Sequence, residues 1–144
     1  MFTQRLVTAV GGAAVLAVVG FGCGGSDNSS DAGGDNPLVG TWRVTTLNMN
    51  GVDVAPETIM TLVFNADGTA YQSEVDGGVT DAGAGTWTAA GGQVTVSWEA
   101  TATDPAEVET MPYTVNGNTL TVTITGVDGD TGQPMTVTGT LTRM

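Results

Sequence analysis

Carboxylates are the main side chains able to do chemistry in this chain, which holds 15 Asp and Glu, no His, no Lys and a single Cys, Cys23. The missing side chains exclude a Ser-His-Asp triad, a Cys-His pair, a Schiff-base or phosphate-binding Lys, and zinc or iron sites built on His or Cys. Paired carboxylates can hydrolyse glycosides, but nothing in the sequence fixes two acids across a cleft. We therefore expect that the protein is not an enzyme.

One acidic stretch could hold a hard cation. Ca²⁺ is bound by several carboxylate and carbonyl oxygens, and Asp128-Gly-Asp130-Thr-Gly132 resembles a fragment of a calcium loop that lacks the terminal bidentate acid. Asp128 and Asp130 are the candidate ligands. Two other interpretations stay open: the acidic loops bind a cationic partner, or Asp and Gly serve as turn residues while the acids keep the protein soluble.

The net charge of −12 excludes partners that are themselves strongly anionic. A phosphate backbone would repel such a protein, so we expect no binding to nucleic acid. Anionic membrane surfaces are equally unfavourable for the folded part. The protein is expected to be a monomer.

The first 37 residues predict export and attachment to a membrane. Residues 1–22 combine a short positive start with an apolar core, as in a signal peptide. Gly20-Phe-Gly-Cys23 resembles a bacterial lipobox, with Gly20 where Leu is usual, so Cys23 is the expected site of acylation, including palmitate. An ordinary cleaved signal peptide and an uncleaved anchor are the alternatives. Residues 23–37 form a Gly/Ser/Asp tether, and Gly24 in place of Asp favours the outer membrane in a Gram-negative cell, by resemblance.

The remaining chain, residues 38–144, predicts one all-β domain. Alternating residues mark strands, and Asn-Gly or Asp-Gly pairs mark tight turns. Eight short strands joined in sequence indicate an antiparallel up-and-down barrel. The expected strands are 39–49, 58–64, 69–75, 84–89, 93–100, 110–115, 119–126 and 135–143.

One face of each expected strand is apolar and should point into the barrel. The alternation is cleanest in the last two strands, where Leu120, Val122 and Ile124 oppose a row of Thr residues. The other residues expected inside are Trp42, Val44, Leu62, Phe64, Tyr71, Val75, Trp87, Val94, Val96, Trp98, Met111, Tyr113, Val115, Met135, Val137 and Leu141. Arg143 has the same parity as Leu141, so it is also expected to point inward, unless the C-terminus frays and releases it to solvent.

Five segments of this domain resemble the bacterial lipocalin-like domain family over residues 38–144: Leu38-Val-Gly-Thr-Trp42, Thr61-Leu-Val-Phe-Asn-Ala-Asp-Gly-Thr69, Gly85-Thr-Trp-Thr88, Tyr113-Thr-Val-Asn-Gly-Asn-Thr-Leu120 and Thr140-Leu-Thr-Arg143. In lipocalins a Gly-x-Trp motif lies at the closed end of the barrel and an Arg near the last strand packs over the Trp. The resemblance assigns these roles to Gly40, Trp42 and Arg143. A cation–π contact between Arg and Trp would stabilise this end by about 1–2 kcal/mol.

The resemblance implies a calycin-like binding module for a small apolar or amphipathic ligand. The candidate lining residues are Phe64, Tyr71, Trp87, Trp98 and Tyr113. The chain is shorter than most lipocalins and lacks a second motif of the Thr-Asp-Tyr kind. The alternative is therefore a barrel filled by its own aromatic side chains, with a structural or interaction role.

The acids are expected to gather at one end of the barrel. In an up-and-down barrel the connections alternate ends, and the longer ones should lie opposite both termini. These connections are expected to hold Asp53, Glu57, Asp76, Asp81, Asp104, Glu107, Glu109, Asp128 and Asp130. The tether would then hold the closed end toward the membrane and leave an acidic mouth facing outward.

Overall fold

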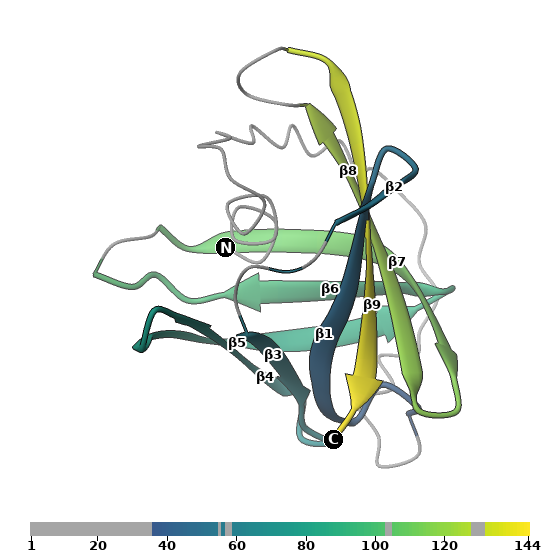
Figure 1. Cartoon of the computed structure of the whole chain (residues 1–144). Coiled ribbons are helices and arrows are strands. Elements are labelled where there is room, and N and C mark those ends of the chain that lie inside the picture. Colours follow the sequence, from purple (N-terminus) through teal and green to yellow (C-terminus); the bar gives the residue numbers. More distant parts are fainter. Residues whose placement is uncertain (1–35, 55, 57–58, 103–104, 128–131) are drawn as a thin grey trace.

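The structure is a computed structural model that describes residues 36–54, 56, 59–102, 105–127 and 132–144. The expected signal peptide, Cys23, most of the tether, and Asp128 and Asp130 lie outside these residues. The described part is all β (Figure 1), and none of its segments is a helix long and apolar enough to cross a membrane. Its strands are β1 (Gly40–Met49), β2 (Val52–Val54), β3 (Ile59–Phe64), β4 (Thr69–Asp76), β5 (Val79–Ala90), β6 (Gln93–Trp98), β7 (Glu107–Asn116), β8 (Thr119–Val127) and β9 (Pro134–Arg143).

The strands form one antiparallel sheet that closes on itself. From β3 to β9 each strand pairs with the next one along the chain, β1 pairs with β3, and an additional pairing of β1 with β9 completes the ring. β2 pairs with the far end of β1 alone, so it is a short arm outside the ring of eight long strands. The predicted eight-stranded antiparallel barrel is therefore confirmed. Figure 1 shows the β8–β9 hairpin extending beyond the rest of the barrel.

The connection between β4 and β5 differs from the expectation of a long loop. Gly77 and Gly78 have φ values of 54° and 89°, which is the left-handed backbone that a two-residue hairpin turn needs. β5 therefore begins at Val79, and Asp81 lies in the strand opposite Glu74. The prediction that Asp81 belongs to a long loop was wrong because two adjacent glycines close the hairpin at once.

Strand β7 also begins earlier than expected. It starts at Glu107, and Val108 and Glu109 pair with Ser97 and Val96 of β6. Glu107 and Glu109 were expected in a loop, but both belong to the barrel wall. Because side chains alternate along a strand, Glu109 shares its face with Met111, which is buried.

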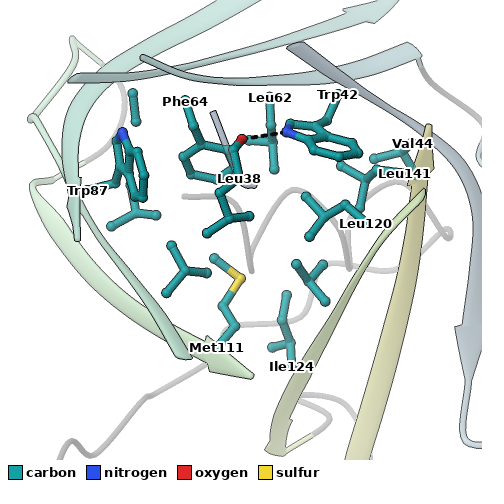
Figure 2. Close-up of a cluster of buried hydrophobic side chains, with 14 of the residues drawn as sticks. Leu38, Trp42, Val44, Leu62, Phe64, Trp87, Met111, Leu120, Ile124 and Leu141 are labelled. Carbon is teal, nitrogen blue, oxygen red and sulfur yellow. Dashed lines mark hydrogen bonds between the residues drawn. The ribbon is translucent and has the colours of Figure 1, made fainter. Parts of the chain in front are cut away.

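Apolar side chains fill the closed end of the barrel. We call the seven buried residues at this end the barrel floor: Leu38, Trp42, Leu62, Phe64, Trp87, Leu120 and Leu141. Figure 2 shows Leu38 at the middle of this cluster, although it precedes β1. A break in the pairing of β1 with β9 between Val44 and Thr46 then shifts the alternation, so that Leu47 is buried as well.

Candidate functional site

The closed end is held by an arginine that lies over a tryptophan. The Arg143 guanidinium carbon is 4.3 Å from the centre of the Trp42 ring. The same guanidinium donates hydrogen bonds to the Val39 carbonyl at 2.6 Å and to the Pro37 carbonyl at 2.7 Å. The Trp42 indole N–H donates to the Leu38 carbonyl at 2.8 Å (Figure 2). Together these contacts tie the end of the tether and the last strand to the barrel floor.

Gly40 makes room for this arrangement. Its φ is +146°, and a Cβ built there would lie 2.5 Å from an Arg143 guanidinium nitrogen. A larger residue would therefore be strained in its backbone and would also push Arg143 away. The structure thus brings together the three residues, Gly40, Trp42 and Arg143, that the sequence assigned to the closed end.

Two of the candidate lining aromatics are part of the packed floor. The rings of Phe64 and Trp87 are in edge contact, with centroids 5.4 Å apart and an angle of 70°. The Trp87 indole N–H donates to the Asn65 carbonyl at 2.9 Å, which joins the ring to the β3–β4 turn. Both side chains are therefore packed within the barrel floor, and a ligand could contact only the side of the floor that faces the barrel interior.

Tyr71 was predicted to point inward, and this prediction was wrong. Its side chain is 48% exposed on the outer face, beside a surface hollow of about 350 Å³ lined by small residues such as Ser73 and Ala82. On β4 the buried residues are instead Ala70 and Gln72. Ala70 lies directly opposite Phe64, and beside that large ring the interior accepts only a small side chain. Val75 has the parity of Tyr71 and was misassigned for the same reason.

The inner wall formed by β4, β5, β6 and β7 carries polar groups above the floor. We call five neighbouring residues on it the inner-wall site: Gln72, Gly83, Gly85, Trp98 and Glu109. Gln72 pairs with Gly83 and Gly85 pairs with Trp98, so the two glycines separate the carboxamide from the indole. The two glycines are buried and contribute no side chain. At Gly85 a Cβ would collide with the backbone carbonyl of Ser97, so glycine allows β6 to approach closely there.

Glu109 and Trp98 form one half of this site. The Trp98 indole N–H donates to the Glu109 carboxylate at 2.8 Å, and the two residues lie diagonally across β6 and β7. Glu109 is only 5% exposed and Trp98 only 2%. Its place on an inner barrel wall sets Glu109 apart from the exposed acids of the described residues, such as Asp53 and Asp67.

Gln72 forms the other half. Its side chain is 4% exposed, and the amide nitrogen has no hydrogen-bond acceptor among the described residues. A buried donor left in this state typically costs about 1–3 kcal/mol. Such a group is uncommon in folded proteins and calls for an explanation.

The barrel wall is loose between β7 and β8, next to Glu109. The two strands pair only between Tyr113–Asn116 and Thr119–Val122. The Tyr113 N–H donates to the Gly92 carbonyl on the β6 side. Because successive backbone N–H groups point to opposite sides of a strand, the ring nitrogen of Pro112 faces β8. Proline has no N–H to donate, so the hydrogen-bond ladder between β7 and β8 ends there. A hollow of about 70 Å³ follows, lined by Glu109, Met111, Ile124 and their neighbours.

The other predicted site residues divide between the described residues and the rest of the chain. Tyr113 is half-buried on the inner face and packs against the core. Within the described residues no three Asp, Glu, Cys or His side chains are placed to hold a metal ion. Glu57, Asp104, Asp128 and Asp130 lie outside them, so the calcium hypothesis stays a prediction.

Sequence reasoning missed Gln72 and Glu109. The signal for Glu109 was available, because continuing the alternation backward from Met111 places Glu109 on the inner face. For Gln72 the signal was ambiguous, since apolar residues occupy both faces of its strand. Neither residue type is common inside a barrel, and both were overlooked for that reason.

Comparison with known proteins gives two structures of similar outline and one matching family. Two structures of bovine odorant-binding protein are similar in outline: one in complex with a selenium-containing odorant (20% identity, TM-score 0.44, 74% of this chain and 73% of that chain) and one with its natural ligand (18% identity, TM-score 0.44, 85% and 77%). No curated protein matches the sequence significantly. The model of the lipocalin-like domain family matches residues 38–111, which is half of the chain. The chain therefore belongs to the lipocalin-like domain family.

Proposed function

We propose that the barrel binds a small amphipathic molecule above its floor. The observation that carries this proposal is the buried Gln72 amide nitrogen, which has no acceptor among the described residues. A ligand with a carbonyl or hydroxyl oxygen would supply that acceptor. Since a carboxamide can turn to present its oxygen instead, the same side chain also suits a ligand donor.

The floor limits the size of such a ligand. Leu38, Trp42 and Phe64 are among the fully buried side chains at the closed end, so no ligand reaches the bottom of the barrel. The apolar part of the ligand would rest on the upper side of this cluster, and its polar group would meet the inner-wall site. Ligand sites of this kind are mostly apolar, with a few polar groups that fix orientation.

Native mass spectrometry of the purified protein tests whether a small molecule is retained. A bound species of defined mass that dissociates on collisional activation is the expected result. Addition of octan-1-ol as a neutral probe should also change the intrinsic fluorescence, because all three Trp residues face the barrel interior. If no adduct is found and octanol leaves the fluorescence unchanged, the barrel is a filled structural or interaction module instead.

A pair of variants links binding to the proposed site. Gln72→Leu keeps the approximate size of the side chain and removes its polar group, and it should weaken octanol binding about three- to tenfold. Gln93→Leu is the matched control, because Gln93 is exposed on β6. Equal binding by the two variants would contradict a role for Gln72.

The same proposal includes attachment to a membrane through Cys23. Arg143 donates to the carbonyl of Pro37, so the chain leaves the barrel at its closed end, on the side of the expected tether. A lipid anchor would then leave the opposite end of the barrel free. Mass spectrometry of the membrane fraction should detect an acylated N-terminal Cys23, and an unmodified chain in the soluble fraction would contradict the anchor.

A further inference from the structure

We infer that two copies of this chain associate through the outer face of β4, with Tyr71 of each copy seated in a hollow on the other. The inference is independent of the proposed ligand site, which lies inside the barrel. It concerns the surface hollow of about 350 Å³ beside Tyr71. We call the six residues whose side chains border this hollow the outer patch: Thr61, Val63, Tyr71, Ser73, Ala82 and Ala84.

The outer patch combines a projecting ring with a hollow. Its members form two rows across β3, β4 and β5, which are Val63, Tyr71 and Ala84 in one row and Thr61, Ser73 and Ala82 in the other. Tyr71 is 48% exposed, so its ring projects from the surface as a knob. Ser73, Ala82 and Ala84 have short side chains, which leave the hollow beside it. A knob and a hole therefore lie next to each other on one face of the barrel.

This juxtaposition makes the outer patch complementary to itself. A two-fold axis that crosses β4 between Tyr71 and Ser73 places the tyrosine of each copy over the serine of the other. Such a contact is isologous, because both copies use the same surface. Two sheets that pack face to face lie about 10 Å apart, so each ring can fill the hollow opposite it. The match between two parts of one surface favours a second copy over an unrelated partner.

The distribution of charge favours contact at the same place. Two copies of a chain with a net charge of −12 repel each other, so they meet most easily where the surface carries no acids. All six residues of the outer patch are uncharged. Because side chains alternate along a strand, the acids of β4 and β5 have the parity of the inner face: Glu74, Asp76 and Asp81. Arg43 on β1 and Glu99 after β6 lie at opposite rims of the patch, one charge of each sign.

The residue types also suit an interface between proteins. The centres of such interfaces are depleted of charged residues and enriched in Tyr. A tyrosine has two side-chain torsions, so holding its ring costs little conformational entropy. The hydroxyls of Thr61 and Ser73 border the hollow and can accept a hydrogen bond from the Tyr71 hydroxyl of the other copy. Ile59, which is 47% exposed at the start of β3, continues the apolar surface.

The small size of the outer patch predicts a weak dimer. Its six residues are far fewer than the roughly 20–30 residues per side of a standard interface, so we expect a dissociation constant of about 10–100 µM. The monomer expected from the sequence is then the dilute form of the protein. Sedimentation equilibrium of the purified protein over this range should show the average mass rising from that of a monomer toward that of a dimer. A protein that stays monomeric throughout would leave the hollow to a different partner and overturn the inference.

Two single variants test the knob and the hole separately. Tyr71→Ser removes the knob and Ser73→Tyr fills the hole, and each should weaken self-association about tenfold or more. Both positions lie on the outer face, so both proteins should remain folded, which a thermal melt verifies. Thr88→Tyr adds an exposed tyrosine on β5 outside the patch, and this control should leave the dissociation constant unchanged. Association of both single variants as tight as that of the parent would place the contact elsewhere and overturn the inference.

Mixing the two single variants is the decisive experiment. One copy then carries serine at both positions and the other carries tyrosine at both, so that each knob again faces a hole. The mixture should form heterodimers about as tight as the parent dimer. The double variant Tyr71→Ser/Ser73→Tyr, which has the composition of the parent, should recover self-association. Nonspecific adhesion of an apolar surface would not produce this pattern. If neither the mixture nor the double variant associates more tightly than the single variants, the inference is overturned.

Discussion

The barrel floor and the inner-wall site lie on strands of the same barrel but differ in the polarity of their buried side chains. At the floor, every large side chain is apolar, and the polar atoms of its tryptophans are satisfied, as where the Trp42 and Trp87 indoles donate to backbone carbonyls. On the inner wall, a buried carboxylate and a buried carboxamide face the interior, and the Gln72 amide nitrogen has no acceptor in the described part of the chain. The floor is thus a completely packed apolar core, while the wall retains one amide nitrogen whose lack of an acceptor among the described residues costs stability.

This difference separates residues that stabilise the fold from residues that serve binding. Apolar burial stabilises by about 25 cal/mol per Å², whereas a buried polar atom without a partner destabilises. Substitutions at the floor should therefore lower stability, and a substitution that removes the unsatisfied amide of Gln72 should not.

Trp42→Ala should have the largest effect on stability. The side chain is fully buried, and its removal leaves a cavity under Arg143, so the free energy of unfolding should fall by about 3–5 kcal/mol. Tyr71→Ala is the matched control, because Tyr71 is an aromatic residue 48% exposed on the outer face, and it should cost about 1 kcal/mol or less. Guanidinium unfolding measures both. A small loss in Trp42→Ala would mean that the floor is not the core of the domain.

Arg143→Met should weaken the closed end by a smaller amount. It removes the contact with the Trp42 ring and the hydrogen bonds to the Val39 and Pro37 carbonyls. The expected loss in the free energy of unfolding is about 1–3 kcal/mol. Arg43→Met removes an equal charge from an exposed site and should change stability by less than about 0.5 kcal/mol. Equal losses in the two variants would point to net charge, and not to the closed-end contacts, as the cause.

Gln72→Leu should change stability in the opposite direction. Replacing the buried carboxamide by an apolar side chain of similar size removes a donor that lacks an acceptor, so the free energy of unfolding should rise by about 1 kcal/mol. Gln93→Leu, on the exposed face, should leave it within about 0.5 kcal/mol of the parent. Greater stability combined with weaker binding would mark Gln72 as a residue kept for function. A loss of stability would show that its amide is already satisfied.

The sequence predicted the floor better than the wall, and the strands explain why. In β8 and β9 apolar residues alternate strictly with Thr, so Leu120 and Leu141 could be placed inside at once. In β4 apolar residues occupy both faces, with Ala70 on one and Tyr71 on the other. The larger side chain was chosen for the interior, but Phe64 on the neighbouring strand leaves room only for the smaller one.

The inner-wall site depends on features that alternation does not encode. Placing Glu109 on the inner face requires the knowledge that β7 begins at Glu107. The acids near Pro105 instead suggested that this stretch was still a loop. Whether Gln72 finds an acceptor depends on its register with Gly83, which a strand pattern alone does not specify. Length and turn chemistry predicted the barrel, whereas the polar groups inside it needed the pairing of four strands.

The smallest expected effect concerns a charge beside the apolar floor, in the turn between β3 and β4. Asp67, in the turn after Phe64, accepts hydrogen bonds from the Thr69 hydroxyl at 2.6 Å and the Thr69 backbone N–H at 2.9 Å. The hydroxyl bond foremost, and then the backbone bond, lower the pKa of Asp67 below its ordinary value of 3.8. A carboxyl with a lowered pKa stabilises the folded state above its unfolded pKa, and this contribution is lost as the pH falls through the folded pKa.

Asp67→Asn keeps an oxygen acceptor and removes the charge, so it isolates this contribution. The variant should be slightly less stable than the parent at pH 7, and the difference should disappear below the lowered pKa of Asp67. Because the carboxyl is fully exposed to solvent, the effect should be smaller than that of any variant above. Melting temperatures of the two proteins between pH 7 and pH 2 measure it. A difference that persists at pH 2 would assign the effect to turn geometry and leave the floor without any dependence on charge.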